Sequence, residues 1–106
     1  MNIYDVSTFE KEVIDSKEPV LVDFWAPWCV HCLRMTAVVE DFAAKNSDIK
    51  VCKINVDENN SIATKYRIKS IPCLVLFKNG EEVKREVGYL TEAQLKLLTG
   101  ICKMEK

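Results

Sequence analysis

At 106 residues the chain is near the usual size of one domain, long enough to close a hydrophobic core without a metal or structural crosslinks. Apolar residues make up 48% of it, charged residues 29%, and the formal net charge is only -1, as in an ordinary globular protein. So small a net charge gives no field that would attract nucleic acid or an anionic membrane. We therefore expect one domain over residues 1–106, with neither nucleic acid nor membrane as a partner.

The N-terminus and the cysteines indicate a compartment. Residues 1–5 show no basic segment followed by an apolar one, as a secretory signal would, and no apolar run approaches the ~20 residues that span a bilayer. Of the five cysteines, only Cys29 and Cys32 are close in sequence, which is not the pattern of a disulfide framework. In a reducing compartment a lone C-x-x-C pair indicates redox or metal chemistry, so we expect a cytoplasmic protein.

The first half of the chain predicts a helix, a strand and a second helix. A capping box at Ser7 starts a helix over residues 7–15. The apolar run 20–25 predicts a strand covered on both faces, in which the charge of Asp23 is out of place. A helix that begins near the cysteine pair then follows from apolar residues at helical spacing: Met35, Val38, Val39, Phe42 and Ala43.

The second half continues this alternation. β-formers and helical spacing predict a strand, a short helix opened by Asp57 or Asn59, and a core strand, over residues 49–56, 59–66 and 73–77. Asn79-Gly80 is a strong hairpin signal that joins the last of these strands to an antiparallel strand over residues 82–87. After Gly88, a second capping box at Thr91 starts a last helix, of which one side carries Leu95, Leu98, Ile101 and Cys102.

The order of these elements predicts an α/β fold. Strands that alternate with helices pair in parallel through right-handed crossovers, and the hairpin adds antiparallel strands to the same sheet. We expect a three-layer sandwich with a central mixed β-sheet of four to five strands flanked by helices, an edge strand over residues 2–6 being the fifth. In such sheets the reactive site lies at the carboxyl end of a central strand, which is where residues 28–32 fall.

The cysteine pair has the spacing of a redox site. If Cys29 is the first residue of its helix, unpaired N–H groups and the helix dipole favour its thiolate, which makes it the nucleophile. Cys32, one turn further on the same face, is then the resolving thiol. Val30 and His31 occupy the tuning positions, where an imidazolium would stabilise the thiolate and make the pair more oxidising; a solvated histidine without effect is the alternative. A structural zinc site normally has four protein ligands, and the sequence lacks the second cysteine pair that would complete such a site.

Asp23 lies six residues before Cys29, behind the predicted start of the helix. Desolvation should raise the pKa of Asp23 toward a useful range for proton transfer, although a core carboxylate satisfied by hydrogen bonds is the alternative. Lys53, on the neighbouring strand, is the expected ionic partner, and a surface lysine is its alternative.

The run Val22-Asp23-Phe24-Trp25-Ala26-Pro27-Trp28-Cys29-x-x-Cys32, with the later Ile71-Pro72, Asn79-Gly80 and Gly88, resembles the thioredoxin family in order and spacing. The resemblance covers essentially the whole chain and implies the thioredoxin fold. It implies that Cys29 attacks and Cys32 resolves, and that Asp23 is a buried proton acceptor with Lys53 nearby. It further implies that Pro72 is cis, which would turn the Ile71 backbone toward the cysteines to pair with an extended substrate.

The same resemblance implies a docking groove and a set of partners. The residues that would line this shallow apolar groove are Trp28, Ile71, Gly88 and Tyr89; for the two aromatic side chains core packing is the alternative. The implied activity is reduction of protein disulfides by dithiol–disulfide exchange, with no metal and no cofactor beyond the redox-active Cys29–Cys32 disulfide. The implied partners are disulfide-containing client proteins and a thioredoxin reductase, either a flavoprotein or a ferredoxin-linked enzyme, and the chain is expected to be a monomer.

Some residues depart from the family pattern. Val30-His31 replaces the usual Gly-Pro and looks more like protein disulfide isomerase and the periplasmic disulfide oxidases, so net oxidation or isomerisation stays open as an alternative. Leu33 replaces a basic residue, and Ala37 stands where the family carries a helix-kinking proline, so the helix should be straighter. Cys73 should lie in the layer near the cysteine pair, as an inert buried side chain, a third reactive thiol, or a ligand in a metal- or iron–sulfur-binding module.

Overall fold

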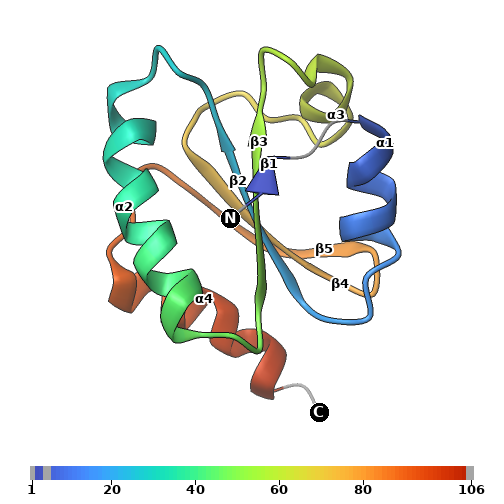
Figure 1. Cartoon of the computed structure of the whole chain (residues 1–106), viewed down its shortest axis with the longest axis vertical. Helices are drawn as coiled ribbons and strands as arrows, with labels where there is room; N and C mark the ends of the chain where they lie inside the picture. Colours follow the sequence, from blue (N-terminus) through green and yellow to red (C-terminus); the bar gives the residue numbers. More distant parts are fainter. Residues whose placement is uncertain (1, 4–5, 105–106) are drawn as a thin grey trace.

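The computed structural model describes residues 2–3 and 6–104, and the side chains of residues 7–100. Helices and strands alternate along the chain as predicted (Figure 1). In order they are β1 (Asn2–Ile3), α1 (Val6–Phe9), the π-helical segment η1 (Glu10–Ile14), β2 (Val20–Trp25), α2 (Val30–Lys45), β3 (Lys50–Asn55), α3 (Asn60–Lys65), β4 (Cys73–Lys78), β5 (Glu81–Val87) and α4 (Glu92–Met104). No helix in this part of the chain is long and apolar enough to cross a bilayer.

The strands form one mixed five-stranded sheet, in the order β1-β3-β2-β4-β5. β2 lies at its centre, parallel to β3 and antiparallel to β4. This register sets Asp23 of β2 between Lys53 of β3 and Leu74 of β4. The predicted mixed sheet is confirmed, and its central strand is the one that leads into the cysteine pair.

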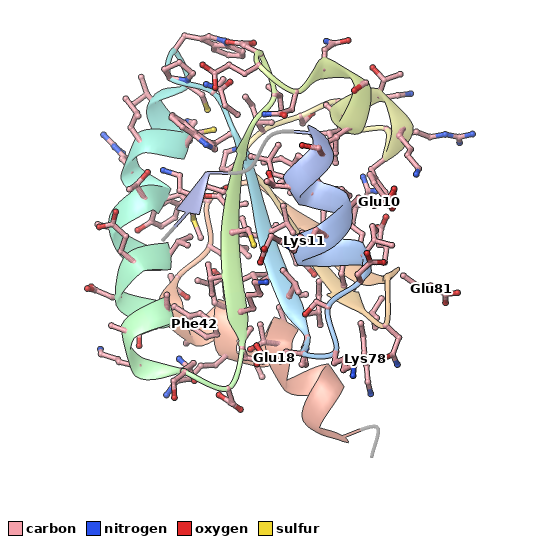
Figure 2. The ribbon with its side chains drawn as sticks, turned by 45° about the vertical axis from the view of Figure 1, so that its right-hand side comes forward. Glu10, Lys11, Glu18, Phe42, Lys78 and Glu81 are labelled. Atoms are coloured by element: carbon pink, nitrogen blue, oxygen red, sulfur yellow. The ribbon has the colours of Figure 1, made fainter. Side chains whose placement is uncertain are left out.

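Helices cover both faces of the sheet, which confirms the three-layer sandwich. α1, η1 and α3 lie on one side, and α2 and α4 on the other (Figure 1). The core on the α1 and α3 side includes Phe9, Val13, Val22, Phe24, Cys52, Ile62, Cys73, Val75 and Phe77. The core on the α2 and α4 side includes Leu21, Met35, Val39, Phe42, Leu74, Leu95 and Leu98, with Phe42 near the lower end of α2 in Figure 2.

The β4–β5 hairpin turns at Asn79 and Gly80, as predicted. Both have positive φ, 54° and 81°, which is the backbone of the turn that joins twisted antiparallel strands. A Cβ atom at Gly80 would lie 2.8 Å from the carbonyl oxygen of Ile14, so the position needs glycine for space as well as for conformation. The strand after the turn begins at Glu81, close to the predicted start, and Figure 2 shows Lys78 and Glu81 at this end of the hairpin.

The helix starts agree only in part with the predictions. The capping box at Thr91 is confirmed, because the Gln94 N–H donates to Thr91 Oγ1 (3.2 Å) and the Thr91 N–H donates to Gln94 Oε1 (2.8 Å). The cap predicted at Ser7 is wrong, since Val6 is already helical. Of the edge strand predicted over residues 2–6, Asn2–Ile3 pairs with β3 and Val6 is helical instead, while residues 4 and 5 lie outside the described part of the chain.

Candidate active site

Cys29 is the N-terminal cap of α2. β2 ends at Trp25, and after a short loop Cys29 has extended backbone angles (φ −92°, ψ 111°), so the helix begins at Val30. The prediction that Cys29 is the first helical residue is therefore off by one position. The reason is the side chain: Cys29 Sγ accepts the N–H of Cys32 at 3.2 Å, a capping bond that forms from a residue with non-helical backbone.

The two sulfur atoms of the pair differ in access. Both cysteines are free thiols, and Cys29 keeps 8% of its surface exposed whereas Cys32 is fully buried. The Cys29 thiol also lies 3.7 Å from the carbonyl oxygen of Ile71, to which it donates. Of the pair, Cys29 is thus the one within reach of another protein, and the N–H donor and the helix N-terminus favour negative charge on its sulfur.

Cys32 is held as a neutral thiol. Burial raises the pKa of Cys32 to about 12, and the Cys29 sulfur and the charge of Asp23 act in the same direction. At neutral pH this side chain therefore needs a proton acceptor before it can attack a disulfide.

Asp23 lies buried in the middle of the sheet. The residue is fully buried, and neither carboxylate oxygen has a hydrogen-bond partner within the described part of the chain. Burial raises the pKa of Asp23 from its ordinary value of 3.8 to about 7, against a smaller lowering by the charge of Lys53. The upward shift in the pKa of Asp23 that the sequence predicts is confirmed, and the alternative of a carboxylate satisfied by hydrogen bonds is wrong.

Lys53 is next to Asp23 in register but bonds elsewhere. Its ammonium donates to Thr36 Oγ1 at 3.0 Å and lies 4.2 Å from the centroid of the Trp25 ring. Only 9% of the residue is exposed, so the alternative of a surface lysine is wrong. The expected ionic interaction acts through space, because no hydrogen bond joins the ammonium to Asp23.

Contacts and chain neighbours connect the residues of the implied docking groove to Cys29. The Ile71–Pro72 bond is cis, as the resemblance implies, and the Ile71 carbonyl faces the Cys29 sulfur. The Gly88 N–H donates to the Pro72 carbonyl at 2.8 Å, which joins the end of β5 to this loop. Trp28 is 68% exposed and Tyr89 47%, so for both aromatic side chains the alternative of core packing is wrong.

Trp28 is fixed in place by Asp57. Its Nε1–H donates to Asp57 Oδ2 at 2.9 Å, and the Asp57 backbone N–H in turn donates to Asn55 Oδ1, also at 2.9 Å. Asn59 occupies the N-cap position of α3 as predicted, but its side chain donates to the Asn55 carbonyl and makes no capping bond. The loop after β3 thus holds an exposed aromatic ring beside the cysteine pair.

Val30 and His31 both lie exposed in the first turn of α2. No hydrogen bond joins the His31 imidazole to the Cys29 sulfur among the described residues, so any effect on the thiolate acts through space or through the helix backbone. Leu33, 52% exposed, adds apolar surface in the same turn. α2 runs unbroken through Ala37 to Lys45.

Cys73 does not lie in the layer of the cysteine pair, contrary to the prediction. Its side chain belongs to the core on the α1 and α3 side of the sheet, whereas the cysteine pair is at the start of α2 on the other side. Burial raises the pKa of Cys73 as well, so it is a poor nucleophile. Cys52 is buried in the same core, and the side chain of Cys102 is outside the described set.

Comparison with known proteins identifies the family. The family model described as Thioredoxin matches residues 1–99. The chain is 49% identical over 90 residues to Thioredoxin 1 of Synechococcus elongatus, with 84% of each chain covered. It is 50% identical over 88 residues to Thioredoxin of Rickettsia bellii, covering 82% of this chain and 83% of that one. The chain belongs to the thioredoxin family.

As a thioredoxin-family member the chain is a thiol–disulfide oxidoreductase, and its activity is that of a protein-disulfide reductase that works through Cys29 and Cys32. The comparisons give no support to the oxidase, isomerase or metal-binding alternatives. Among the described residues there is no group of three or more His, Cys, Asp or Glu side chains that could hold a metal ion.

Three residues of the site were not found from the sequence: Trp25, Thr36 and Asp57. Thr36 had a usable signal, because it follows Cys32 by four residues and so lies one helical turn above it. Trp25 and Asp57 had none, because their partners come from other elements of the fold.

The buried carboxyl group predicts a pH-dependent stability. Folding raises the pKa of Asp23 from its ordinary 3.8 to about 7. Between these two pH values the folded protein keeps a proton on Asp23 that the unfolded chain has lost. The contribution of this proton to the free energy of unfolding is complete below pH 3.8 and is lost as the pH rises to about 7. At about 1.4 kcal/mol per pKa unit it reaches up to about 4 kcal/mol. Asp23→Asn should therefore gain free energy of unfolding relative to wild type from about pH 4 to 7.5, measured by urea unfolding of the reduced protein.

Asp41→Asn, which changes an exposed carboxylate of α2, is the matched control and should follow the wild-type profile. Any fixed cost of burying the amide that Asp23→Asn introduces cancels in the slope against pH. Parallel profiles for wild type and Asp23→Asn would show that Asp23 is ionised throughout this range.

Proposed function

We propose that the chain reduces client disulfides in two exchange steps. In the first, the Cys29 thiolate attacks one sulfur of the client disulfide; the client S–S bond breaks, and the other client sulfur leaves as a thiolate. In the second, the deprotonated Cys32 attacks Cys29 Sγ, which forms the Cys29–Cys32 disulfide and releases the remaining client sulfur as a thiolate. Two electrons pass to the client, and the Cys29–Cys32 disulfide is the only redox group required.

The observation that carries this proposal is the capping hydrogen bond at Cys29. A sulfur that accepts a free N–H at the start of a helix is stabilised as an anion, and Cys29 is also the more exposed member of the pair. Cys32 lies one turn behind it, buried and protonated, which suits a thiol that acts only after a mixed disulfide has formed. These differences support the roles of attacking and resolving cysteine.

Asp23 is the proposed proton acceptor for Cys32. A carboxyl group with a pKa of about 7 is divided between its two forms near neutral pH, so it can take up and return a proton there. Its charge raises the pKa of Cys32, and this electrostatic interaction supports a proton transfer between the two groups. We propose that the charge of Lys53 lowers the pKa of Asp23 through space.

The client is proposed to dock as an extended segment beside Ile71. The Ile71 carbonyl already lies at the Cys29 sulfur, which supports backbone pairing that brings a client disulfide to the nucleophile. The exposed rings of Trp28 and Tyr89 supply apolar contact area, and Pro72 and Gly88 shape the backbone between them. Trp28 is held ready by Asp57, so little ordering is needed on binding.

The electron donor and the setting are inferred from the family and the composition. We propose that a thioredoxin reductase, a flavoprotein or a ferredoxin-linked enzyme, returns electrons to the Cys29–Cys32 disulfide. In this scheme the chain acts in electron transport as a cytoplasmic monomer with one domain over residues 1–106. Its net charge of -1 supports neither nucleic acid nor an anionic membrane as a partner.

Substitution of each cysteine of the pair tests the two steps. Cys29→Ser should abolish reduction of insulin disulfides, because no attacking sulfur remains. Cys32→Ser should leave a client joined to Cys29, visible by mass spectrometry and released by dithiothreitol. Cys52→Ala, which changes a buried cysteine in the other core, is the control and should keep activity. Normal turnover by Cys29→Ser would overturn the assignment of the nucleophile.

Val30 and His31 are proposed to tune the reduction potential of the pair. An imidazole in the first turn, close to the Cys29 sulfur along the helix, favours the thiolate and so the reduced form. His31→Pro, tolerated sterically in a first turn, should lower the potential by about 30 mV or more, which corresponds to about 1.4 kcal/mol. Equilibration with a glutathione buffer series measures this.

His31→Gln separates the effect of the imidazole from that of the backbone, since it removes the ring and leaves the backbone N–H. A potential unchanged in both variants would show that His31 has no tuning role.

A further inference from the structure

The position of the Lys53 ammonium is not explained by its register. Lys53 is directly opposite Asp23 on the adjacent parallel strand, where a buried lysine and a buried carboxylate would be expected to form an ion pair. Within the described part of the chain both Asp23 oxygens instead lack a hydrogen-bond partner, and the ammonium donates to Thr36 Oγ1 at 3.0 Å. A side chain of α2 has therefore taken the hydrogen bond that Asp23 could accept.

The hydroxyl of Thr36 is oriented to accept this bond. A hydroxyl has one proton to donate, and Thr36 directs it at the carbonyl oxygen of Cys32, four residues earlier, at 3.3 Å. Its lone pairs then face the ammonium of Lys53. This arrangement links the charge on β3 to the helical turn that carries the resolving cysteine.

The ring of Trp25 completes the surroundings of Lys53. The ammonium lies 4.2 Å from the ring centroid, a distance at which the face of the indole attracts a cation. The titratable groups coupled to Asp23 are Lys53 of β3, whose charge lowers the pKa of Asp23, and Cys32 of α2 and Cys73 of β4, whose pKa values the charge of Asp23 raises. Of these only Lys53 carries a positive charge, so its position decides how strongly the carboxylate form of Asp23 is stabilised.

We propose that Thr36 is a positioning residue that holds the Lys53 ammonium out of hydrogen-bond contact with Asp23 and so keeps Asp23 able to accept the proton of Cys32. This inference rests on the proposed role of Asp23 in the resolving step. Without the hydroxyl, the buried ammonium loses its oxygen acceptor, and the carboxylate of Asp23 is the partner across the strand pair. A direct ion pair would hold Asp23 ionised and make it a weaker base.

Removal and restoration of the hydroxyl test the proposal. Thr36→Val replaces the hydroxyl by a methyl group of similar size, and Thr36→Ser keeps the hydroxyl without the methyl. The titration of Asp23 is followed in each reduced protein by the NMR signal of the Asp23 carboxyl carbon. This signal is assigned by its absence from the spectrum of Asp23→Asn. The midpoint should fall by at least one pH unit in Thr36→Val, about a tenfold loss of proton affinity, and return in Thr36→Ser.

The controls keep this test decisive. Thr64→Val removes an exposed hydroxyl of α3 and should leave the Asp23 midpoint unchanged. Thr36→Ala removes the same hydroxyl with a good helix former and serves if the valine variant folds poorly. An Asp23 midpoint in folded Thr36→Val or Thr36→Ala equal to that of wild type would overturn the proposal, as would failure of Thr36→Ser to restore it.

A kinetic measurement separates this proposal from the one on which it rests. The rate at which Cys32 releases a client from Cys29 is measured against pH in wild type, Asp23→Asn and Thr36→Val. The profile of Thr36→Val should move to lower pH together with the Asp23 midpoint. If Asp23→Asn keeps the wild-type profile, Asp23 is not the proton acceptor and the proposed function of Asp23 fails, whereas the NMR midpoints still decide whether Thr36 positions Lys53.

Discussion

The hydrogen bond from the Cys32 N–H to the Cys29 sulfur is the interaction around which the site is built. It requires Cys29 to keep an extended backbone, and it therefore fixes where α2 begins. It sets the sulfur at the positive end of a helix of 16 residues and puts Cys32 one turn behind it. One cap thus determines the position, the charge preference and the partner of the nucleophile.

The buried ionisable groups next to this cap, Asp23 and Lys53, lower the free energy of unfolding. A carboxylate without a hydrogen bond in the middle of a sheet is costly, and a core designed for stability alone would place an apolar residue at Asp23. The Lys53 ammonium, held by Thr36 and Trp25, compensates only in part, since burial still dominates the pKa of Asp23. Local rules of protein architecture are broken mostly at functional sites, and this pair lies where the resolving thiol must lose a proton.

The fold followed from the sequence because its signals were local and agreed with one another. The apolar run of β2, the Asn79-Gly80 turn and the Thr91 capping box each act over a few residues, so their spacing is readable in the chain. The cis Ile71–Pro72 bond came from family resemblance, since nothing in the residues themselves distinguishes it from a trans bond.

The errors arose where a side chain's direction depends on parts of the chain far away. Cys73 was assigned to the wrong face because every residue from 73 to 77 is apolar, and a strand buried on both faces carries no alternation to show which side each residue takes. Lys53 acts on Asp23 through space as expected, but the sequence did not indicate that its long flexible stem carries the ammonium to the hydroxyl of Thr36 on a helix. The start of α2 at Val30 depended on a sulfur acting as a cap, which residue preferences do not include.

Among the four cysteines whose side chains the structure describes, Cys29 alone is an accessible, charge-stabilised sulfur. The most direct measurement is alkylation of the fully reduced protein with iodoacetamide at about pH 6.5 to 7, with the modified residues identified by peptide mapping over time. We expect Cys29 to react first and faster than the thiol of glutathione, while Cys32, Cys52 and Cys73 remain protected by burial. Modification of Cys32 as fast as Cys29, or a Cys29 no more reactive than glutathione, would show that Cys29 is not the activated sulfur of the pair.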